Sequence, residues 1–179
     1  MTTIIFEPHG TTYDNEAHLA SGWYDVALSP LGKKQAEELG KRHQDEEFAA
    51  IFCSDLKRAY KTAEVAFEDK DIKIIKDKRL RECNYGDFTR HPSEEVEPEK
   101  ATRIDKPFPN GESYEDAAKR MKEFLSDLLK NYDDKKVIII GHRATQYGLE
   151  HWINHAPLKK IVTAPWSWQP GWIYYLKKI

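Results

Sequence analysis

Two histidines, one arginine and one glutamate follow closely behind apolar stretches of this sequence: His9, Arg58, Glu82 and His142. A neutral imidazole nitrogen is a competent nucleophile near pH 7, because the ordinary pKa of histidine is about 6.5. An arginine can hold two phosphate oxygens at once, and a carboxyl group can protonate a departing alkoxide. Together these residue types are suited to phosphoryl transfer through a phosphohistidine, without a metal ion.

Alternating strand and helix patterns surround these four residues. We expect strands at 3–7, 49–53, 72–75, 137–140 and 172–178. We expect helices at 30–44, 54–67, 113–128 and 145–154, the first with Ser29 as N-cap and Pro30 at its first position. Such alternation predicts an α/β protein with a parallel sheet covered on both faces.

The four residues lie where expected strands end or the next helices begin. His9 and His142 end strands, Glu82 comes shortly after a strand, and Arg58 lies one turn inside a helix. In open α/β sheets, ligands bind beyond the carboxyl ends of the strands. Helix N-termini there present free backbone N–H groups to anions. We therefore expect the four side chains to meet in one pocket at that edge of the sheet.

Composition limits the class of protein. The 179 residues suggest one domain, with 40% apolar and 32% charged residues. A net charge of -2 gives no support for a nucleic-acid or membrane partner, and no apolar run is long enough to cross a bilayer. No secretory signal peptide is visible, and neither Cys53 nor Cys83 belongs to a CxxC pair. We expect reduced thiols and a cytoplasmic protein.

Residues 86–111 form a polar stretch with four prolines. No strand or helix is expected there, so the stretch is predicted to be one long loop. A loop of that length in a compact domain is usually a functional lid or a disordered segment. Its acidic run, Glu94-Glu95-Val96-Glu97, would disfavour a polyanionic substrate if it faced the pocket.

Six segments, in order along the chain, give the sequence a resemblance to a known family. The chain resembles the histidine phosphatase superfamily, also called phosphoglycerate mutase-like, over most of residues 4–150. The matching segments are PHGTTYDNE (8–16), LSPLGKKQAEELG (28–40), IFCSDLKRAYKTAE (51–64), LRECNYGDF (80–88), NGESYEDAAKRM (110–121) and VIIIGHRA (137–144). The most specific of them is SDLKRAYKTAE.

The resemblance implies a three-layer α/β/α sandwich with a mostly parallel sheet, as a single histidine phosphatase domain over 1–179. It implies a phosphomonoester hydrolase that acts on a small phosphorylated substrate without a cofactor. By position, His9 would be the phosphorylated nucleophile and Glu82 the general acid and later the base. Arg58 and His142 would bind the phosphoryl oxygens. The oligomeric state cannot be read from the sequence.

Four further residues receive roles from the resemblance. Gly10 and Asn15 line the phosphate end of the site in this family, and Ser21 and Gly22 occupy the loop that contacts the substrate. Beyond the resemblance, Trp23 is a candidate substrate contact, and the segment 166–170 could form a wall of the pocket.

One position departs from the family pattern. The usual motif begins Arg-His-Gly, whereas this chain has Pro8-His9-Gly10, and proline has neither a charge nor a backbone N–H. Three interpretations stay open. In the first, another basic residue takes the place of the arginine, with Arg143 as first candidate and Arg90 as second. In the second, the enzyme is weak, or its substrate brings different charge. In the third, the site only binds phosphate ligands. A phosphoglycerate mutase-type phosphotransferase is a further alternative, although mutases in the family tend to be longer.

Overall fold

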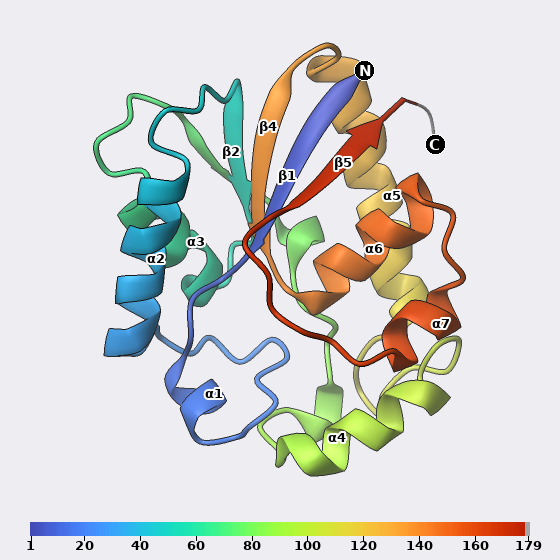
Figure 1. Cartoon of the computed structure of the whole chain (residues 1–179). Helices are drawn as coiled ribbons and strands as arrows, with labels where there is room; N and C mark the ends of the chain where they lie inside the picture. Colours follow the sequence, from blue (N-terminus) through green and yellow to red (C-terminus); the bar gives the residue numbers. More distant parts are fainter. Residues whose placement is uncertain (178–179) are drawn as a thin grey trace.

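Five strands form a single sheet in the order β3-β2-β4-β1-β5 in the computed structural model, which describes residues 1–177. They are β1 (Thr2–Pro8), β2 (Ala50–Cys53), β3 (Ile74–Lys76), β4 (Lys136–Gly141) and β5 (Trp172–Leu176). The first four run parallel, and β5 pairs antiparallel with β1 at one edge. The predicted mostly parallel sheet is therefore confirmed, and the chain is a three-layer α/β/α sandwich (Figure 1).

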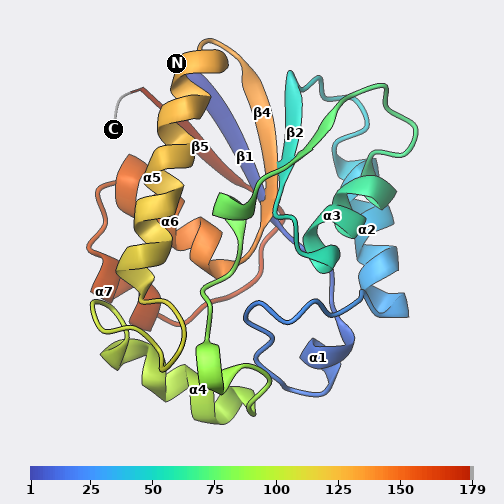
Figure 2. The same cartoon turned by 180° about the vertical axis from the view of Figure 1, so that it is seen from behind.

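Helices cover both faces of the sheet (Figures 1 and 2). One face carries α2 (Pro30–Arg42) and α3 (Lys57–Ala66), and the other carries α5 (Tyr114–Asn131) and α6 (Arg143–Ile153). On β4, Ile138 and Ile140 pack toward the first pair of helices, whereas Val137 and Ile139 pack toward the second. Burial on both faces explains why this strand reads as a continuous apolar run.

The helix predicted after Ser113 is confirmed as α5. The Ser113 hydroxyl accepts a hydrogen bond from the backbone N–H of Asp116, and the Asp116 carboxylate accepts one from the N–H of Ser113. This reciprocal capping box satisfies two of the otherwise unpaired donors at the helix start. The predicted apolar stripe along α5 is buried: Tyr114, Ala117, Ala118, Met121, Phe124, Leu125 and Leu128.

Several predicted boundaries differ from the observed ones. Helix α3 begins at Lys57 with Leu56 at the cap position, not with the predicted cap Ser54-Asp55, because the Ser54 hydroxyl accepts from the N–H of Leu56 and so closes a turn before the helix. Helix α6 begins at Arg143, two residues early, and α2 ends at Arg42. Strand β5 ends at Leu176, and residue 178 of the predicted strand lies outside the described residues.

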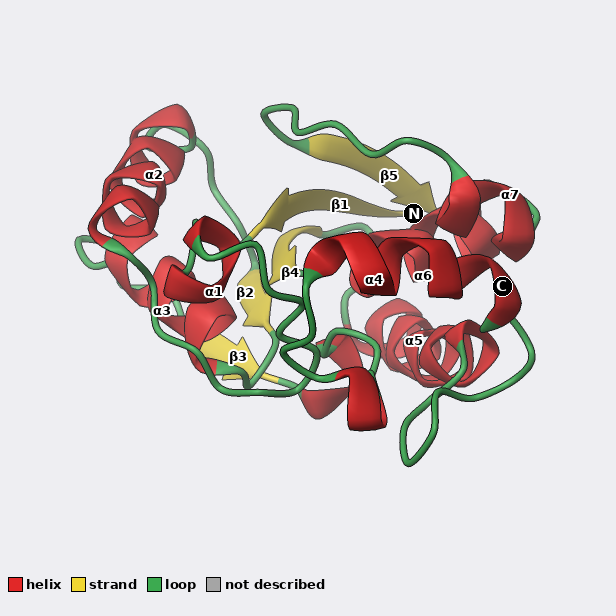
Figure 3. Cartoon of the chain, turned by 90° about the horizontal axis from the view of Figure 1, so that it is seen from below, coloured by secondary structure: helices red, strands yellow, loops and turns green. Residues whose placement is uncertain are grey.

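The prediction of one unbroken loop over 86–111 is wrong. The segment contains α4 (Ser93–Glu99) and the short 3₁₀ helices η2 (Gly86–Phe88) and η3 (Lys100–Thr102). Val96 on α4 is buried in a cluster with residues of α5, α6 and α7 (Leu158–Thr163), and this packing holds the otherwise polar helix in place. In Figure 1 α4 lies below the level at which β1 and β4 finish, and Figure 3, seen from below, shows it over α6 and beside those strand ends.

Three further elements were not predicted from the sequence: α1 (Tyr13–Glu16), α7 (Leu158–Thr163) and the 3₁₀ helix η1 (Lys78–Leu80). All are too short to show an apolar periodicity in the sequence, and α1 and η1 are capped by the neighbouring side chains of Thr12 and Asp77. Among the helices of residues 1–177, none has the length and apolar character needed to cross a membrane.

Candidate active site

A cavity of about 580 Å³ lies at the carboxyl ends of β1 and β4. Its walls come from the β1–α1 connection, α2, α3, α4 and the start of α6. Nine residues proposed from the sequence line it: His9, Gly10, Asn15, Ser21, Gly22, Arg58, Glu82, His142 and Arg143. The further candidates Trp23 and Arg90 do not line it. Residues separated by more than a hundred positions in the chain thus share one space.

His9 is held in a defined orientation where β1 ends. Its backbone N–H donates to the Gly141 carbonyl at 3.1 Å, and its ring Nδ1 lies 2.7 Å from the Gly10 carbonyl oxygen. A carbonyl only accepts, so Nδ1 carries the proton and Nε2 keeps the free lone pair. Burial, with the charge of Arg58 beside it, lowers the pKa of His9 to about 3. His9 is therefore neutral at physiological pH, as a nucleophile must be.

His142 faces His9 across the cavity, with 5.0 Å between the two ring centroids. The His142 side chain is only 1% exposed, and within residues 1–177 neither of its ring nitrogens has a hydrogen-bond partner. Burial and then Arg58 hold the pKa of His142 well below its ordinary value. A buried ring with two unmatched nitrogens is costly, and a ligand oxygen that accepts a hydrogen bond from His142 would remove part of that cost.

Arg58 reaches the same space from the first turn of α3 and is 2% exposed. Its guanidinium donates to the carbonyl oxygens of Gly22 at 2.7 Å and Tyr24 at 3.0 Å. Burial lowers the pKa of Arg58, which remains a cation because an arginine starts so high. Arg58 thus places a positive charge beside both histidines and fixes the loop that carries Ser21 and Gly22.

Glu82 is buried, and its carboxylate is oriented by main-chain donors. Oε1 accepts from the backbone N–H of Cys83 at 2.8 Å and of Ala144 at 3.2 Å. No hydrogen bond engages Oε2 among residues 1–177. The second oxygen is therefore available on a side chain that lines the cavity.

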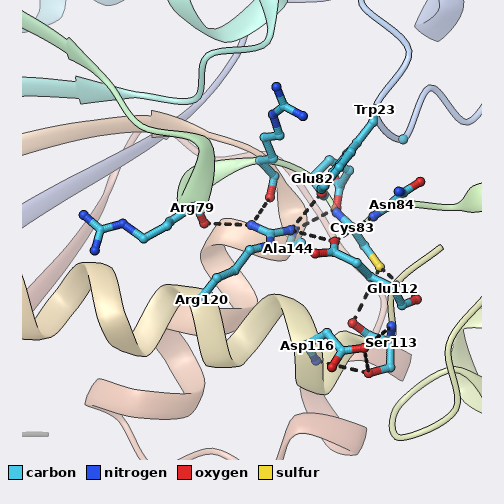
Figure 4. A network of polar contacts seen from close by, with 12 residues as sticks. Trp23, Arg79, Glu82, Cys83, Asn84, Glu112, Ser113, Asp116, Arg120 and Ala144 are labelled. Atoms are coloured by element: carbon cyan, nitrogen blue, oxygen red, sulfur yellow. Dashed lines mark hydrogen bonds and ion pairs between the residues drawn. The ribbon is translucent and has the colours of Figure 1, made fainter.

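The backbone at Glu82 is held from behind by Arg120 on α5 (Figure 4). The Arg120 guanidinium donates to the carbonyl oxygens of Arg79, Arg81 and Glu82 at 2.7, 2.8 and 2.9 Å. It also pairs with both carboxylate oxygens of Glu112. Trp23 donates from its indole nitrogen to the Glu82 carbonyl at 2.6 Å, and Trp23 is not among the residues that line the cavity.

Asn15 and Ser21 organise the loop after His9. The Asn15 side-chain oxygen accepts from the N–H of Thr12 at 3.0 Å, within the capping box of α1. The Ser21 hydroxyl donates to the buried Asp14 at 3.1 Å. Gly10 lies against the backbone of Gly32, so close that a side chain at position 10 would overlap it.

The two candidate substitutes for the absent arginine lie in different places. Arg143 lines the cavity and donates to Glu97 at 2.9 Å and to the Tyr147 hydroxyl at 3.0 Å. Arg90 is not a lining residue; it pairs with Asp14 at 3.2 Å and covers the ring of Tyr24. The geometry thus favours Arg143 over Arg90 as the substitute for the arginine that Pro8 replaces.

Other lining residues were not proposed from the sequence as site residues: Glu7, Arg42, Tyr85, Glu97 and Lys100. Glu7 lies near the end of an apolar strand, Arg42 ends α2, and the other three lie in the segment 82–100, so none of them stands at a spacing that indicates a site. Trp166 and Trp168 form part of the wall, as the sequence had suggested.

A comparison with protein-family models decides the family. The model of the histidine phosphatase superfamily (branch 1) matches residues 4–168. The chain belongs to the histidine phosphatase superfamily. It is 32% identical over 149 residues to the uncharacterised phosphatase PhoE of Bacillus subtilis (strain 168), covering 83% of this chain and 76% of PhoE. It is also 32% identical over 150 residues to phosphoserine phosphatase 1 of Hydrogenobacter thermophilus, covering 79% of this chain and 71% of that protein.

Solved structures agree with this membership of the histidine phosphatase superfamily. The structure of YhfR from Bacillus stearothermophilus superimposes with a TM-score of 0.85 at 26% identity, covering 98% of this chain and 95% of YhfR. The phosphoglycerate mutase-like fold expected from the sequence is thus confirmed.

Proposed function

We propose that this chain is a phosphomonoester hydrolase that works through a phosphohistidine on His9 and uses no metal ion. One observation carries the proposal: a neutral His9 with a free Nε2 lies beside the buried ring of His142, whose nitrogens have no hydrogen-bond partner in the described part of the chain, in a cavity that also holds Arg58. This arrangement supplies a nucleophile and donors for an oxyanion in one place. Its phosphatase-named relatives support the same class of reaction.

In the first step, Nε2 of His9 forms a bond to phosphorus while the bond from phosphorus to the ester oxygen breaks. Protonated Glu82 gives its proton to the departing oxygen, so the alcohol leaves neutral. Arg58 stabilises the charge on the equatorial phosphoryl oxygens. A proton on His142, whose ring is otherwise unmatched, adds a further donor to those oxygens.

In the second step, water replaces His9 on phosphorus. The Glu82 carboxylate takes one proton from that water, the new P–O bond forms, and the P–N bond to Nε2 breaks. Inorganic phosphate leaves, and His9 and Glu82 return to their starting protonation states. Because Oε1 of Glu82 is fixed by two backbone N–H groups, Oε2 is the oxygen that we assign to both proton transfers.

We further propose that Arg143 supplies positive charge that Pro8 cannot. Arg143 lines the cavity directly after His142, whereas the alternative Arg90 is engaged by Asp14 outside it. The substrate class is a small phosphorylated molecule that fits a cavity of about 580 Å³.

A second candidate function is non-catalytic binding of a phosphate ligand. Pro8 favours it, and so does the engagement of Arg58 by the Gly22 and Tyr24 carbonyls. Mutase activity would in addition require the released product to be retained and phosphorylated again.

The deciding experiment measures phosphate release from phenyl phosphate and a small panel of phosphomonoesters between pH 5 and 8. Wild type is compared with His9→Ala and with Thr163→Ala, an exposed control outside the cavity. Turnover by wild type and the control, with none by His9→Ala, supports the hydrolase. Phosphate binding without turnover supports the binding function instead.

A further inference from the structure

Lys100 is a buried lysine on the wall of the cavity. It lies at the start of η3, directly after α4, and is only 4% exposed. Lysines are almost never buried to this extent without a partner, because the ammonium loses its hydration. The Lys100 ammonium donates to Glu97 Oε1 at 2.7 Å and lies 5.8 Å from the centre of the Tyr85 ring.

The partner of Lys100 is shared with a second cation. Arg143 Nη1 donates to the same oxygen, Glu97 Oε1, at 2.9 Å. Lys100, Arg143 and Glu97 therefore form a cluster of two positive charges and one negative charge, and all three residues line the cavity. Burial, and then the neighbouring charge of Arg143, lower the pKa of Lys100, although Glu97 acts in the opposite direction.

We propose that Lys100, together with Arg143, binds an oxyanion of the substrate and so supplies positive charge that Pro8 cannot. A negatively charged ligand oxygen beside the ammonium would bring the net charge of the cluster to zero. It would also give the ammonium the partner that water cannot provide to a buried side chain. The oxyanion belongs either to the transferred phosphoryl group or to a second acidic group on the leaving part. This proposal rests on the proposed function, since it takes the ligand of the cavity to be a phosphate ester.

The observations favour a binding role over a purely structural one. A lysine needed only to anchor α4 could reach solvent with its ammonium, as long side chains at surfaces usually do. Here the ammonium is buried, Lys100 lines the cavity that contains His9 and Glu82, and the charge of Glu82 raises the pKa of Lys100 against the effect of burial. The segment 86–111 thus contributes a charged side chain to the site.

The test uses three variants of the full chain. Lys100→Met removes the charge and keeps the length, Lys100→Arg keeps a charge, and Lys106→Met removes an exposed lysine of the same segment that does not line the cavity. Binding of inorganic phosphate is measured by calorimetry, and kcat and KM are measured for phenyl phosphate and for carboxyphenyl phosphate. A melting temperature for each variant reports on folding.

If Lys100 binds the phosphoryl group, the Kd for inorganic phosphate rises roughly tenfold or more in Lys100→Met, because one charge-assisted contact is lost. Lys100→Arg keeps most of the affinity, and Lys106→Met keeps all of it. If the oxyanion lies on the leaving part, phosphate binding is unchanged, and Lys100→Met instead raises KM for carboxyphenyl phosphate only. Both results support the proposal and assign the source of the oxyanion.

Unchanged phosphate binding together with unchanged KM for both esters in Lys100→Met would overturn the proposal. So would equal losses in Lys100→Met and Lys100→Arg that follow a fall in melting temperature, because these indicate a structural role. Wild type that binds phosphate without turnover would refute the hydrolase and leave the Lys100 site standing. Wild type that binds neither phosphate nor an ester would refute both.

Discussion

Arg120 donates to the main-chain oxygen of Glu82 at 2.9 Å and so ties the proposed acid to helix α5. The same guanidinium holds the carbonyl oxygens of Arg79 and Arg81 and pairs with Glu112. Arg120 itself is not among the residues that line the cavity, although Glu82 is. Arg120 is therefore a positioning residue, which acts through the backbone that carries Glu82 (Figure 4).

Replacing Arg120 by lysine should lower kcat while leaving phosphate affinity close to wild type. A lysine cannot reach three carbonyls and a carboxylate at once, so the Glu82 segment loses part of its support. A displacement of the acid by about 1 Å can cost on the order of 10²-fold in rate. Steady-state kinetics and phosphate calorimetry check this, with Lys119→Arg on the exposed face of α5 as control. Equal losses in kcat and in phosphate affinity would argue against a positioning role.

Glu82→Gln should affect substrates according to their leaving groups. The amide keeps an oxygen for the N–H groups of Cys83 and Ala144 but has no acidic proton to give. General acid catalysis contributes typically about 10²–10⁴-fold. We expect the rate of the first step to fall by that factor for alkyl phosphates. It should fall less for nitrophenyl phosphate, because nitrophenolate leaves without needing a proton. A uniform loss across leaving groups would contradict the role as acid.

Arg143→Met should reduce kcat/KM more than Arg90→Met does. Arg143 lines the cavity, whereas Arg90 pairs with Asp14 away from it. Loss of one charge-assisted contact to a phosphoryl group corresponds to a decrease of roughly tenfold or more. Kinetics on the two variants with one substrate decide the point. If Arg90→Met is the more damaging change, the assignment of Arg143 is wrong.

Stability should fall as the pH drops below about 6.5, the ordinary pKa of histidine. In the folded protein the pKa of His142 is held well below that value, so the unfolded chain binds the extra proton first. The state that binds more protons becomes more favourable as the pH falls. The free energy of unfolding therefore decreases by up to about 1.4 kcal/mol per pH unit. Urea unfolding at about pH 7 and pH 5 should show a smaller decrease for His142→Gln than for wild type.

His43 provides a control, because its effect on the pH dependence of stability has the opposite sign to that of His142. Hydrogen bonds to Glu7 and Glu46 raise its pKa against the effect of burial. Its contribution to stability is therefore complete below the unfolded pKa and is lost as the pH rises through the folded pKa. His43→Gln should lose more stability at about pH 5 than at higher pH, the reverse of His142→Gln. The same pH dependence in both variants would contradict these assignments.

Sequence patterns predicted the parts of the molecule that local rules determine. The apolar run of β4 and the capped, amphipathic α5 follow from burial and periodicity. His9 and His142 could be placed together because the ends of parallel strands share one edge of the sheet. The segment around α4 could not be predicted in this way, because a seven-residue acidic helix depends on the burial of Val96 against distant elements.

The charges of the site were only partly predictable. Arg58 and Arg143 follow strands in recognisable positions, whereas Lys100 stands alone in a polar stretch with no periodic signal. Its role depends on where α4 lies beside the strand ends, which only the tertiary structure shows. The tertiary structure also separates the three glutamates of the acidic run: Glu97 lines the cavity, whereas Glu94 and Glu95 do not.

The most direct test of the account is to trap the covalent intermediate. Wild type and Glu82→Gln are mixed with nitrophenyl phosphate, quenched under alkaline conditions that preserve phosphohistidine, and digested for mass spectrometry. We predict one phosphoryl group, on His9, which accumulates in Glu82→Gln because hydrolysis lacks its base, and which is absent from His9→Ala. Steady turnover with no phosphorylated His9, or equal turnover by His9→Ala, would contradict the central claim.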